Sequence, residues 1–189
     1  MNRAIFLDRD GVLDELVHYP EGWGAPRTPA DVRVRSGARD ALGRAAENGW
    51  MIFVISNQPD AAKGLTTVAS LHAVHLELLE KLGDPPIREF FYCFHKSEDR
   101  CECRKPNPFF VLHAARKYDI DLAESWFVGD VDTDIETGRR AGTRTALLEY
   151  EHSSSKRGAQ KADLVCRDLD HFVRTLVRQT SLNGPQSKD

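Results

Sequence analysis

Short apolar runs alternate with longer amphipathic segments along most of the chain. Five runs have the length and composition of buried strands, at residues 4–7, 51–55, 89–92, 126–128 and 145–148. The segments between them repeat apolar residues at three- and four-residue intervals, which predicts helices at 38–48, 66–82, 108–118, 133–141 and 169–177. This alternation is typical of βαβ units, so we expect an α/β fold, doubly wound around a mainly parallel sheet.

Two polar segments interrupt this pattern. Residues 14–31 contain several glycines and prolines, which predicts a long loop near the end of the first strand, and 153–161 read as a flexible connector. A length of 189 residues suits one compact domain, expected at 1–178, followed by a disordered tail at 179–189. No segment is long enough for a large cap domain, so loops alone should cover any site.

The charge distribution argues against a large anionic partner. The formal net charge is −3, from 26 basic and 29 acidic residues that are well mixed along the chain. Without a basic stripe we expect no nucleic acid or membrane partner. No apolar run reaches the roughly 20 residues that span a bilayer, and no signal peptide is evident. We therefore expect a cytoplasmic monomer or small homo-oligomer that acts on a small molecule.

The polar residues that directly follow the predicted strands carry unusual chemistry. The sequence DRDG follows the first strand, SNQ follows the second and GD follows the fourth, while RKP precedes the third helix. In open α/β sheets ligands bind beyond the carboxyl ends of the strands, so these residues are expected to meet at one edge.

This set contains what phosphoryl transfer needs. A carboxylate can attack phosphorus and divide hydrolysis into two easier steps. Asp8, Asp10 and Asp130 repel one another when gathered, and a hard divalent cation, typically Mg²⁺, relieves that repulsion and lets an anionic nucleophile approach phosphate. The oxygens of the phosphate and their charge are then expected to be held by cationic and polar groups, namely Lys105, Ser56 and Asn57.

These motifs resemble those of the haloacid dehalogenase-like phosphatases. The paired aspartates stand as DRDGVLD, the Ser/Thr motif as SNQ, the lysine as Lys105 and the acidic metal motif as GDVDTD, in family order. The resemblance implies that Asp8 is the nucleophile, and that Asp10 acts as general acid and then as base. It also implies Mg²⁺ binding by Asp8, the backbone carbonyl of Asp10 and Asp130, with Asp134 supporting the site from behind.

Four soft or borderline metal donors lie close together before Lys105. Cys93, His95, Cys101 and Cys103 form the pattern C-x-H-x₅-C-x-C, which suits a closed tetrahedral Zn²⁺ site with a structural role. The last of these cysteines is followed directly by Arg104 and Lys105, so zinc would fix the loop that directs both cations at the phosphate.

The zinc loop, which ends in CRKP, narrows the resemblance to one subgroup of the family. That subgroup contains D-glycero-D-manno-heptose 1,7-bisphosphate phosphatase and the histidinol-phosphate phosphatase domain, and it implies that Arg104 binds substrate. The chain departs from the subgroup at Asp14, in the loop ELVHYPEGWGAPRTP, at Pro59-Asp60 and in the shortness of the zinc loop. These departures lie where a substrate would be selected.

We therefore expect a Mg²⁺-dependent phosphatase that hydrolyses a small phosphorylated metabolite, most plausibly a sugar phosphate or bisphosphate, through an aspartyl phosphate. The alternatives are a histidinol-phosphate phosphatase and a nucleic-acid end phosphatase. An alternative of another class is a zinc-stabilised binding module that has lost catalysis. The joint presence of Asp8, Asp10, Lys105 and Asp130 favours an enzyme, because a binding module could lose any of them without unfolding.

Overall fold

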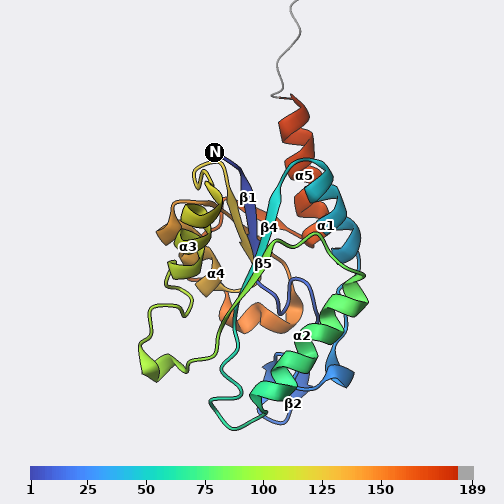
Figure 1. Cartoon of the computed structure of the whole chain (residues 1–189), viewed down its shortest axis with the longest axis vertical. Helices are drawn as coiled ribbons and strands as arrows, with labels where there is room; N and C mark the ends of the chain where they lie inside the picture. Colours follow the sequence, from blue (N-terminus) through green and yellow to red (C-terminus); the bar gives the residue numbers. More distant parts are fainter. Residues whose placement is uncertain (183–189) are drawn as a thin grey trace, which may run out of the picture.

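A parallel six-stranded sheet forms the centre of the molecule (Figure 1). The computed structural model describes residues 1–182, and within them the strand order is β5-β4-β1-β6-β7-β8. The α/β fold with a parallel sheet is therefore confirmed. The strands are β1 (Ala4–Leu7), β4 (Met51–Asn57), β5 (Glu89–Cys93), β6 (Trp126–Gly129), β7 (Arg144–Leu148) and β8 (Leu164–Cys166).

In the described part of the chain, five α-helices cover the two faces of this sheet (Figure 1). Along β1, Ile5 and Leu7 point to one face and Ala4 and Phe6 to the other, so each face has its own buried cluster. The first cluster packs under α1 (Ala38–Glu47), α2 (Val68–Leu82) and α5 (Leu169–Leu182). The second packs under α3 (Phe109–Tyr118) and α4 (Asp132–Ala141).

Several short elements lie where the sequence predicts none. The predicted loop at 14–31 contains an antiparallel hairpin, β2 (Val17–Tyr19) with β3 (Gly22–Gly24), followed by the 3₁₀ turn η1 (Pro29–Asp31). The predicted connector at 153–161 begins inside the 3₁₀ helix η3 (Glu151–Lys156), and β8 adds a sixth strand. A further 3₁₀ turn, η2 (Ser97–Asp99), lies within the loop of the metal donors.

The two ends of the predicted domain also differ in detail. Residues 179–182, predicted to belong to a disordered tail, instead continue α5, and the rest of that tail, 183–189, lies outside the described residues. Helix α3, expected to begin at residue 108, begins at Phe109, and Pro108 is its N-cap residue. The Asn107 side chain donates to the Cys101 carbonyl at 3.0 Å, so it closes the preceding loop.

The position of β1 fixes where a ligand can bind. Its neighbours β4 and β6 lie on opposite sides, so the connections from their carboxyl ends diverge and leave a crevice above β1. Asp8, Ser56 and Asp130 stand at or just beyond these three strand ends. In the described part of the chain, no helix has both the length and the apolar character needed to cross a membrane.

Two helical glycines allow a matched test of this packing. A Cβ on Gly138 would lie 2.7 Å from both the Phe127 Cβ and the Thr145 Cγ2 atoms, whereas Gly43 has no atom within 4 Å of such a position. We expect Gly138→Ala to destabilise the fold by about 1–3 kcal/mol through overpacking. Gly43→Ala should stabilise it by about 0.5–1 kcal/mol. Urea unfolding midpoints measure both, and equal shifts would contradict the close helix–sheet contact.

Candidate active site

A buried lysine joins two aspartates at the centre of the site. Lys105 Nζ lies 2.8 Å from Asp8 Oδ1 and 2.7 Å from Asp134 Oδ1, and all three side chains are at most 10% exposed. Asp8 comes directly after β1, Lys105 lies four residues before α3, and Asp134 lies in the first turn of α4. Three distant segments are thus held together by one ammonium group.

Asp130, the first residue after β6, completes a cluster that could hold a metal ion. One carboxylate oxygen each from Asp8, Asp130 and Asp134 lies within 4.8 Å of the others. Both oxygens of Asp134 already have donors, because Oδ1 meets Lys105 and Oδ2 accepts the backbone N–H groups of Asp130 and Val131, each at 3.2 Å. The cluster suits an oxygen-preferring divalent cation bound by Asp8 and Asp130, with Asp134 supporting them.

Gly11 is required where the first motif meets Asp130. Its φ is +85°, and a Cβ at this position would lie 2.2 Å from the Asp130 Oδ2 atom. The backbone of the first motif therefore approaches the Asp130 carboxylate more closely than any other residue would permit.

Negative charge exceeds positive charge at this buried cluster. Burial, reinforced by the nearby Asp134, raises the pKa of Asp130 to about 7. Burial also raises the pKa of Asp8, although Lys105 opposes that effect. The pKa of Lys105 is raised, because Asp134 and Asp8 outweigh the burial that would lower it. One lysine therefore does not neutralise the carboxylates, which is the condition under which a divalent cation binds strongly.

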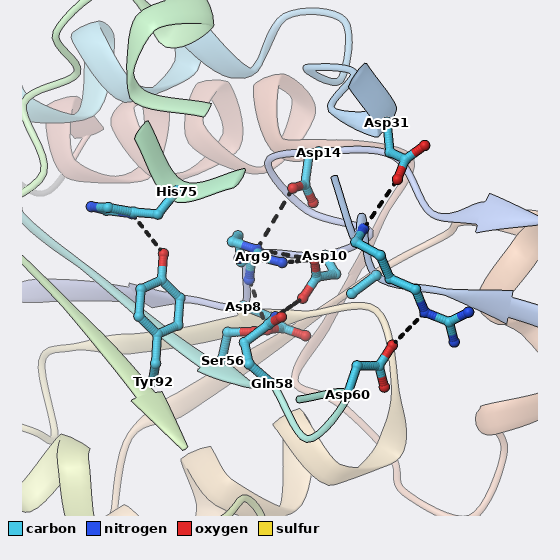
Figure 2. A network of polar contacts seen from close by, with 12 residues as sticks. Asp8, Arg9, Asp10, Asp14, Asp31, Ser56, Gln58, Asp60, His75 and Tyr92 are labelled. Carbon is cyan, nitrogen blue, oxygen red and sulfur yellow. Dashed lines mark hydrogen bonds and ion pairs between the residues drawn. The ribbon is translucent and has the colours of Figure 1, made fainter. Parts of the chain in front are cut away.

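Both carboxylate oxygens of Asp10 accept hydrogen bonds from neighbouring side chains (Figure 2). Arg9 donates to Oδ1 from Nε at 3.0 Å and from Nη2 at 2.6 Å. Ser56 Oγ donates to Oδ2 at 3.0 Å, and Gln58 Nε2 donates to the same oxygen at 2.5 Å. Ser56, expected to hold phosphate, therefore has its hydroxyl directed at Asp10.

Asn57 and Gln58 connect the end of β4 to both ends of the loop that carries the metal donors. The Asn57 side chain accepts from Lys105 N at 3.0 Å and donates to the Lys105 carbonyl at 3.2 Å. The Gln58 N–H donates to the Cys93 carbonyl at 2.7 Å. The Asn57 amide, also expected to hold phosphate, thus holds the backbone of the lysine that faces it.

The four expected zinc donors lie together between β5 and α3. Cys103 Sγ is 3.3 Å from Cys93 Sγ, 3.6 Å from Cys101 Sγ and 3.4 Å from His95 Nδ1. Donors about 2.0–2.3 Å from a tetrahedral zinc lie about 3.5–3.8 Å apart, so the donors are gathered at or slightly inside the spacing for that ion. All four cysteines are free of disulfides. Burial and the two neighbouring thiols raise the pKa of Cys103 to about 12, a cost that a bound cation removes.

A cleft of about 900 Å³ opens above these groups. Asp8, Lys105 and Asp130 form part of its lining, as do Asp10 and Arg104. Residues of the β2–β3 hairpin, the loop after β4, the metal-donor loop and η3 also line it, and we call these segments the rim of the cleft. Most of the residues expected to act on phosphate therefore meet at one cavity, whereas Ser56 and Asp134 are not part of its lining.

Some contributors were missed by the sequence analysis. Ser153 is fully buried in η3 and donates to the Asp130 carbonyl at 3.2 Å, although its polar surroundings predict only a connector. His152 was missed as well; it stacks on Trp23, which lines the cleft, with ring centroids 3.7 Å apart. Gln58 could have been noticed within SNQ, whereas no sequence signal indicates the contacts of Ser153 or His152.

Comparison with known proteins relates the chain to hydrolases of the haloacid dehalogenase-like family. A family model described as HAD-hydrolase-like matches residues 102–172. The chain is 30% identical over 187 residues to D-glycero-beta-D-manno-heptose-1,7-bisphosphate 7-phosphatase of Bordetella bronchiseptica, covering 94% of this chain and 99% of the relative. It is 32% identical over 167 residues to D-glycero-alpha-D-manno-heptose-1,7-bisphosphate 7-phosphatase of Photorhabdus laumondii, covering 82% and 86% respectively.

A solved structure matches nearly the whole chain. The crystal structure of D,D-heptose 1,7-bisphosphate phosphatase from B. bronchiseptica, complexed with magnesium and phosphate, superposes with a TM-score of 0.83 at 28% identity. The match covers 94% of this chain and 99% of that one.

The raised pKa of Asp130 leads to a test by pH. The pKa of Asp130 is about 7 in the folded protein and 3.8 ordinarily, so the folded state holds the proton more tightly than the unfolded state. The protonated carboxyl therefore stabilises the metal-free fold at low pH, and this stabilisation is lost as the pH rises through about 7. Mg²⁺ binds the ionised carboxylate and should reverse this dependence on pH. The increase in unfolding temperature caused by Mg²⁺ should therefore be larger at about pH 8 than at about pH 5.5. Apparent Mg²⁺ affinity should fall up to about tenfold per pH unit below 7.

Asp130→Asn is the control for this measurement. The variant has no carboxylate at that position to titrate or to bind the cation, so most of the Mg²⁺ effect and its pH dependence should disappear. A wild-type response to Mg²⁺ that does not change between the two pH values would contradict the assignment.

Proposed function

The chain belongs to the haloacid dehalogenase-like phosphatases, which are phosphoric monoester hydrolases, and we propose that it hydrolyses one phosphate ester of a sugar bisphosphate through an aspartyl phosphate on Asp8. The observation that carries the proposal is the contact of Lys105 with Asp8 and Asp134 at the floor of the cleft, beside Asp130. This arrangement supports the roles of Asp8 as nucleophile, of Lys105 as the phosphate-binding cation and of Asp8 and Asp130 as metal ligands.

Each of these residues has a distinct role in the proposed reaction. A carboxylate oxygen of Asp8 attacks phosphorus while Asp10 protonates the departing sugar oxygen. Asp10 then takes a proton from the water that attacks the aspartyl phosphate. Mg²⁺, held by Asp8, Asp130 and the backbone carbonyl of Asp10, would shield the negative charges that meet there.

The phosphate is proposed to be held mainly by Lys105 and Arg104. Both side chains line the cleft, and Lys105 already lies 2.8 Å from the nucleophile. Ser56 and Asn57 contribute through Asp10 and through the Lys105 backbone, to which their side chains are bonded.

A bisphosphate is supported by the charges at the rim of the cleft. Arg100 and Lys156 line it, and among residues 1–182 neither lies within 4.0 Å of a carboxylate oxygen. These cations are available for a second anionic group on the substrate. The two similar enzymes named above act on beta and alpha anomers of the same heptose bisphosphate, which makes that sugar the first candidate.

Zn²⁺ is proposed to be structural in this enzyme. The four donors would fill its coordination shell, which leaves no position for substrate or water. Its effect on chemistry would be indirect, because the loop it fixes ends at Arg104 and Lys105. Reduced thiols at this site agree with a cytoplasmic location.

Replacement of the nucleophile tests the proposed reaction. Asp8→Asn keeps the shape of the side chain but cannot form an acyl phosphate, so phosphate release should fall by about a thousandfold or more. Release of inorganic phosphate from p-nitrophenyl phosphate with Mg²⁺ measures this. The exposed Asp40→Asn on α1 is the control and should keep wild-type turnover. Near wild-type turnover by Asp8→Asn would exclude the mechanism.

The substrate class is tested in the same assay. The panel contains both anomers of D-glycero-D-manno-heptose 1,7-bisphosphate, the matching monophosphates, histidinol phosphate and a phosphorylated oligonucleotide end. The proposal expects the highest kcat/KM for a bisphosphate. A preference for histidinol phosphate or for the oligonucleotide would retain the mechanism and replace the substrate.

The zinc site is tested with two cysteine variants. Cys103→Ser removes one thiolate donor, so zinc affinity should fall by more than about 100-fold and thermal stability should decrease. Cys166→Ser is the matched control, because this buried cysteine lies at the end of β8, outside the donor cluster, and its loss should leave zinc content unchanged. Elemental analysis and thermal unfolding measure both effects, and wild-type protein without zinc would refute the proposal.

A further inference from the structure

We propose that Gln58 is a positioning residue for the second half of the reaction, in which it fixes the Asp10 carboxylate for activation of the hydrolytic water. The inference rests on the proposed function, because it assumes that Asp10 is the base for hydrolysis of the Asp8 phosphate. It assigns to Gln58 a task that neither the motif nor the metal sites require.

The Oδ1 edge of Asp10 is held by a buried arginine. Arg9 is 1% exposed and donates to Oδ1 twice, from Nε and from Nη2. Its Nε also lies 3.6 Å from an oxygen of the fully buried Asp14, and its Cζ lies 5.6 Å from the centre of the Tyr92 ring. Figure 2 shows Arg9 between the two aspartates. This edge of the carboxylate is therefore fixed within a packed and charged environment.

The Oδ2 edge is held by two groups of different rigidity. Gln58 is 2% exposed, and its Nε2 donates both to Asp10 Oδ2 at 2.5 Å and to Ser56 Oγ at 2.9 Å. Its backbone N–H also donates to the Cys93 carbonyl at 2.7 Å, so burial and hydrogen bonds hold both the main chain and the side-chain amide in place. The Ser56 hydroxyl hydrogen can rotate away from Oδ2. The hydrolytic water can then replace Ser56 as the hydrogen-bond donor to this oxygen. Gln58 keeps the carboxylate in place during that exchange.

The step that depends on this orientation is defined by its bonds. Water oxygen forms a bond to phosphorus as the bond from phosphorus to the Asp8 oxygen breaks, and the electron pair returns to the Asp8 carboxylate. Asp10 accepts the proton of the water, and inorganic phosphate leaves. By contrast, p-nitrophenolate leaves in the first half-reaction without protonation, so its release reports that step without Asp10.

Pre-steady-state kinetics with p-nitrophenyl phosphate separate the two halves. Gln58→Met keeps the length of the side chain but removes both N–H donors. We expect a burst of one p-nitrophenolate per enzyme at the wild-type rate, followed by a steady-state rate lowered about 10- to 100-fold. The aspartyl phosphate on Asp8 should accumulate, which intact-protein mass spectrometry after acid quench detects as one added phosphate.

Two further variants make the result decisive. Ser125→Ala is the structural control, because the buried Ser125 hydroxyl also makes two hydrogen bonds: it accepts from Ala4 N at 2.9 Å and donates to the Asp121 carbonyl at 2.5 Å. Ser125 directly precedes β6, at the amino ends of the strands and so at the opposite end of the sheet from the site. The substitution should lower stability and leave the ratio of burst rate to steady-state rate unchanged. Asp10→Asn should stop the second step more completely than Gln58→Met.

The possible outcomes distinguish the role of Gln58 from the proposed function on which that role rests. If Asp10→Asn arrests hydrolysis while Gln58→Met keeps the wild-type ratio of the two rates, the role of Gln58 is refuted and the proposed function stands. If Gln58→Met lowers burst and steady-state rates equally, its role is structural and the inference is also refuted. If Asp10→Asn turns over normally, the proposed function itself fails.

Discussion

The burial of several carboxylates with too few cations is the constraint on which the site depends. Asp8, Asp14, Asp130 and Asp134 are buried and Asp10 lies among them, while Arg9 and Lys105 are the buried cations of this cluster. A buried charge is tolerated only when it is paired or neutralised. Arg9 forms ion pairs with Asp10 and Asp14, and Lys105 forms ion pairs with Asp8 and Asp134. Asp130 has neither cation as a direct partner, so its raised pKa and the proposed divalent cation have the same cause.

The three residues Ser56, Asn57 and Gln58 link Asp10, the proposed acid–base residue, to the loop of the metal donors. Two of their side chains reach Asp10, the third holds the Lys105 backbone, and the Gln58 N–H binds the Cys93 carbonyl. Consequently a disturbance at the proposed zinc site has two short routes to the chemistry. One passes along the chain from Cys103 to Lys105, and the other crosses from Cys93 through Gln58 to Asp10. A structural metal can in this way affect catalysis without contacting substrate.

The sequence predicted the sheet centre and the convergence of the site because both follow from long, regular signals. The apolar runs of β1, β4 and β6 are buried on both faces, and their carboxyl ends necessarily meet at one edge. β8 was missed because it has three residues and Val165 is exposed, and the hairpin because glycine flanks Trp23 on both sides in β3. The partners of Ser56 and Asn57 could not be predicted, since a motif gives residue types and not hydrogen-bond directions. Ser153 had no signal because its burial depends on the distant Asp130 carbonyl.

The rim of the cleft is held together by different contacts from its floor. Asp60, two residues after SNQ, pairs with Arg27 at 2.9 Å and so ties the loop after β4 to the hairpin segment. On the other side Trp23 of the hairpin stacks on His152 of η3. The rim is thus joined by an ion pair and an aromatic stack of partly exposed side chains, whereas the floor is joined by buried ion pairs that tolerate little change. Substitutions at the rim should therefore leave the buried ion pairs of the floor in place, so that the proposed substrate preference can change while the proposed phosphoryl-transfer geometry below is retained.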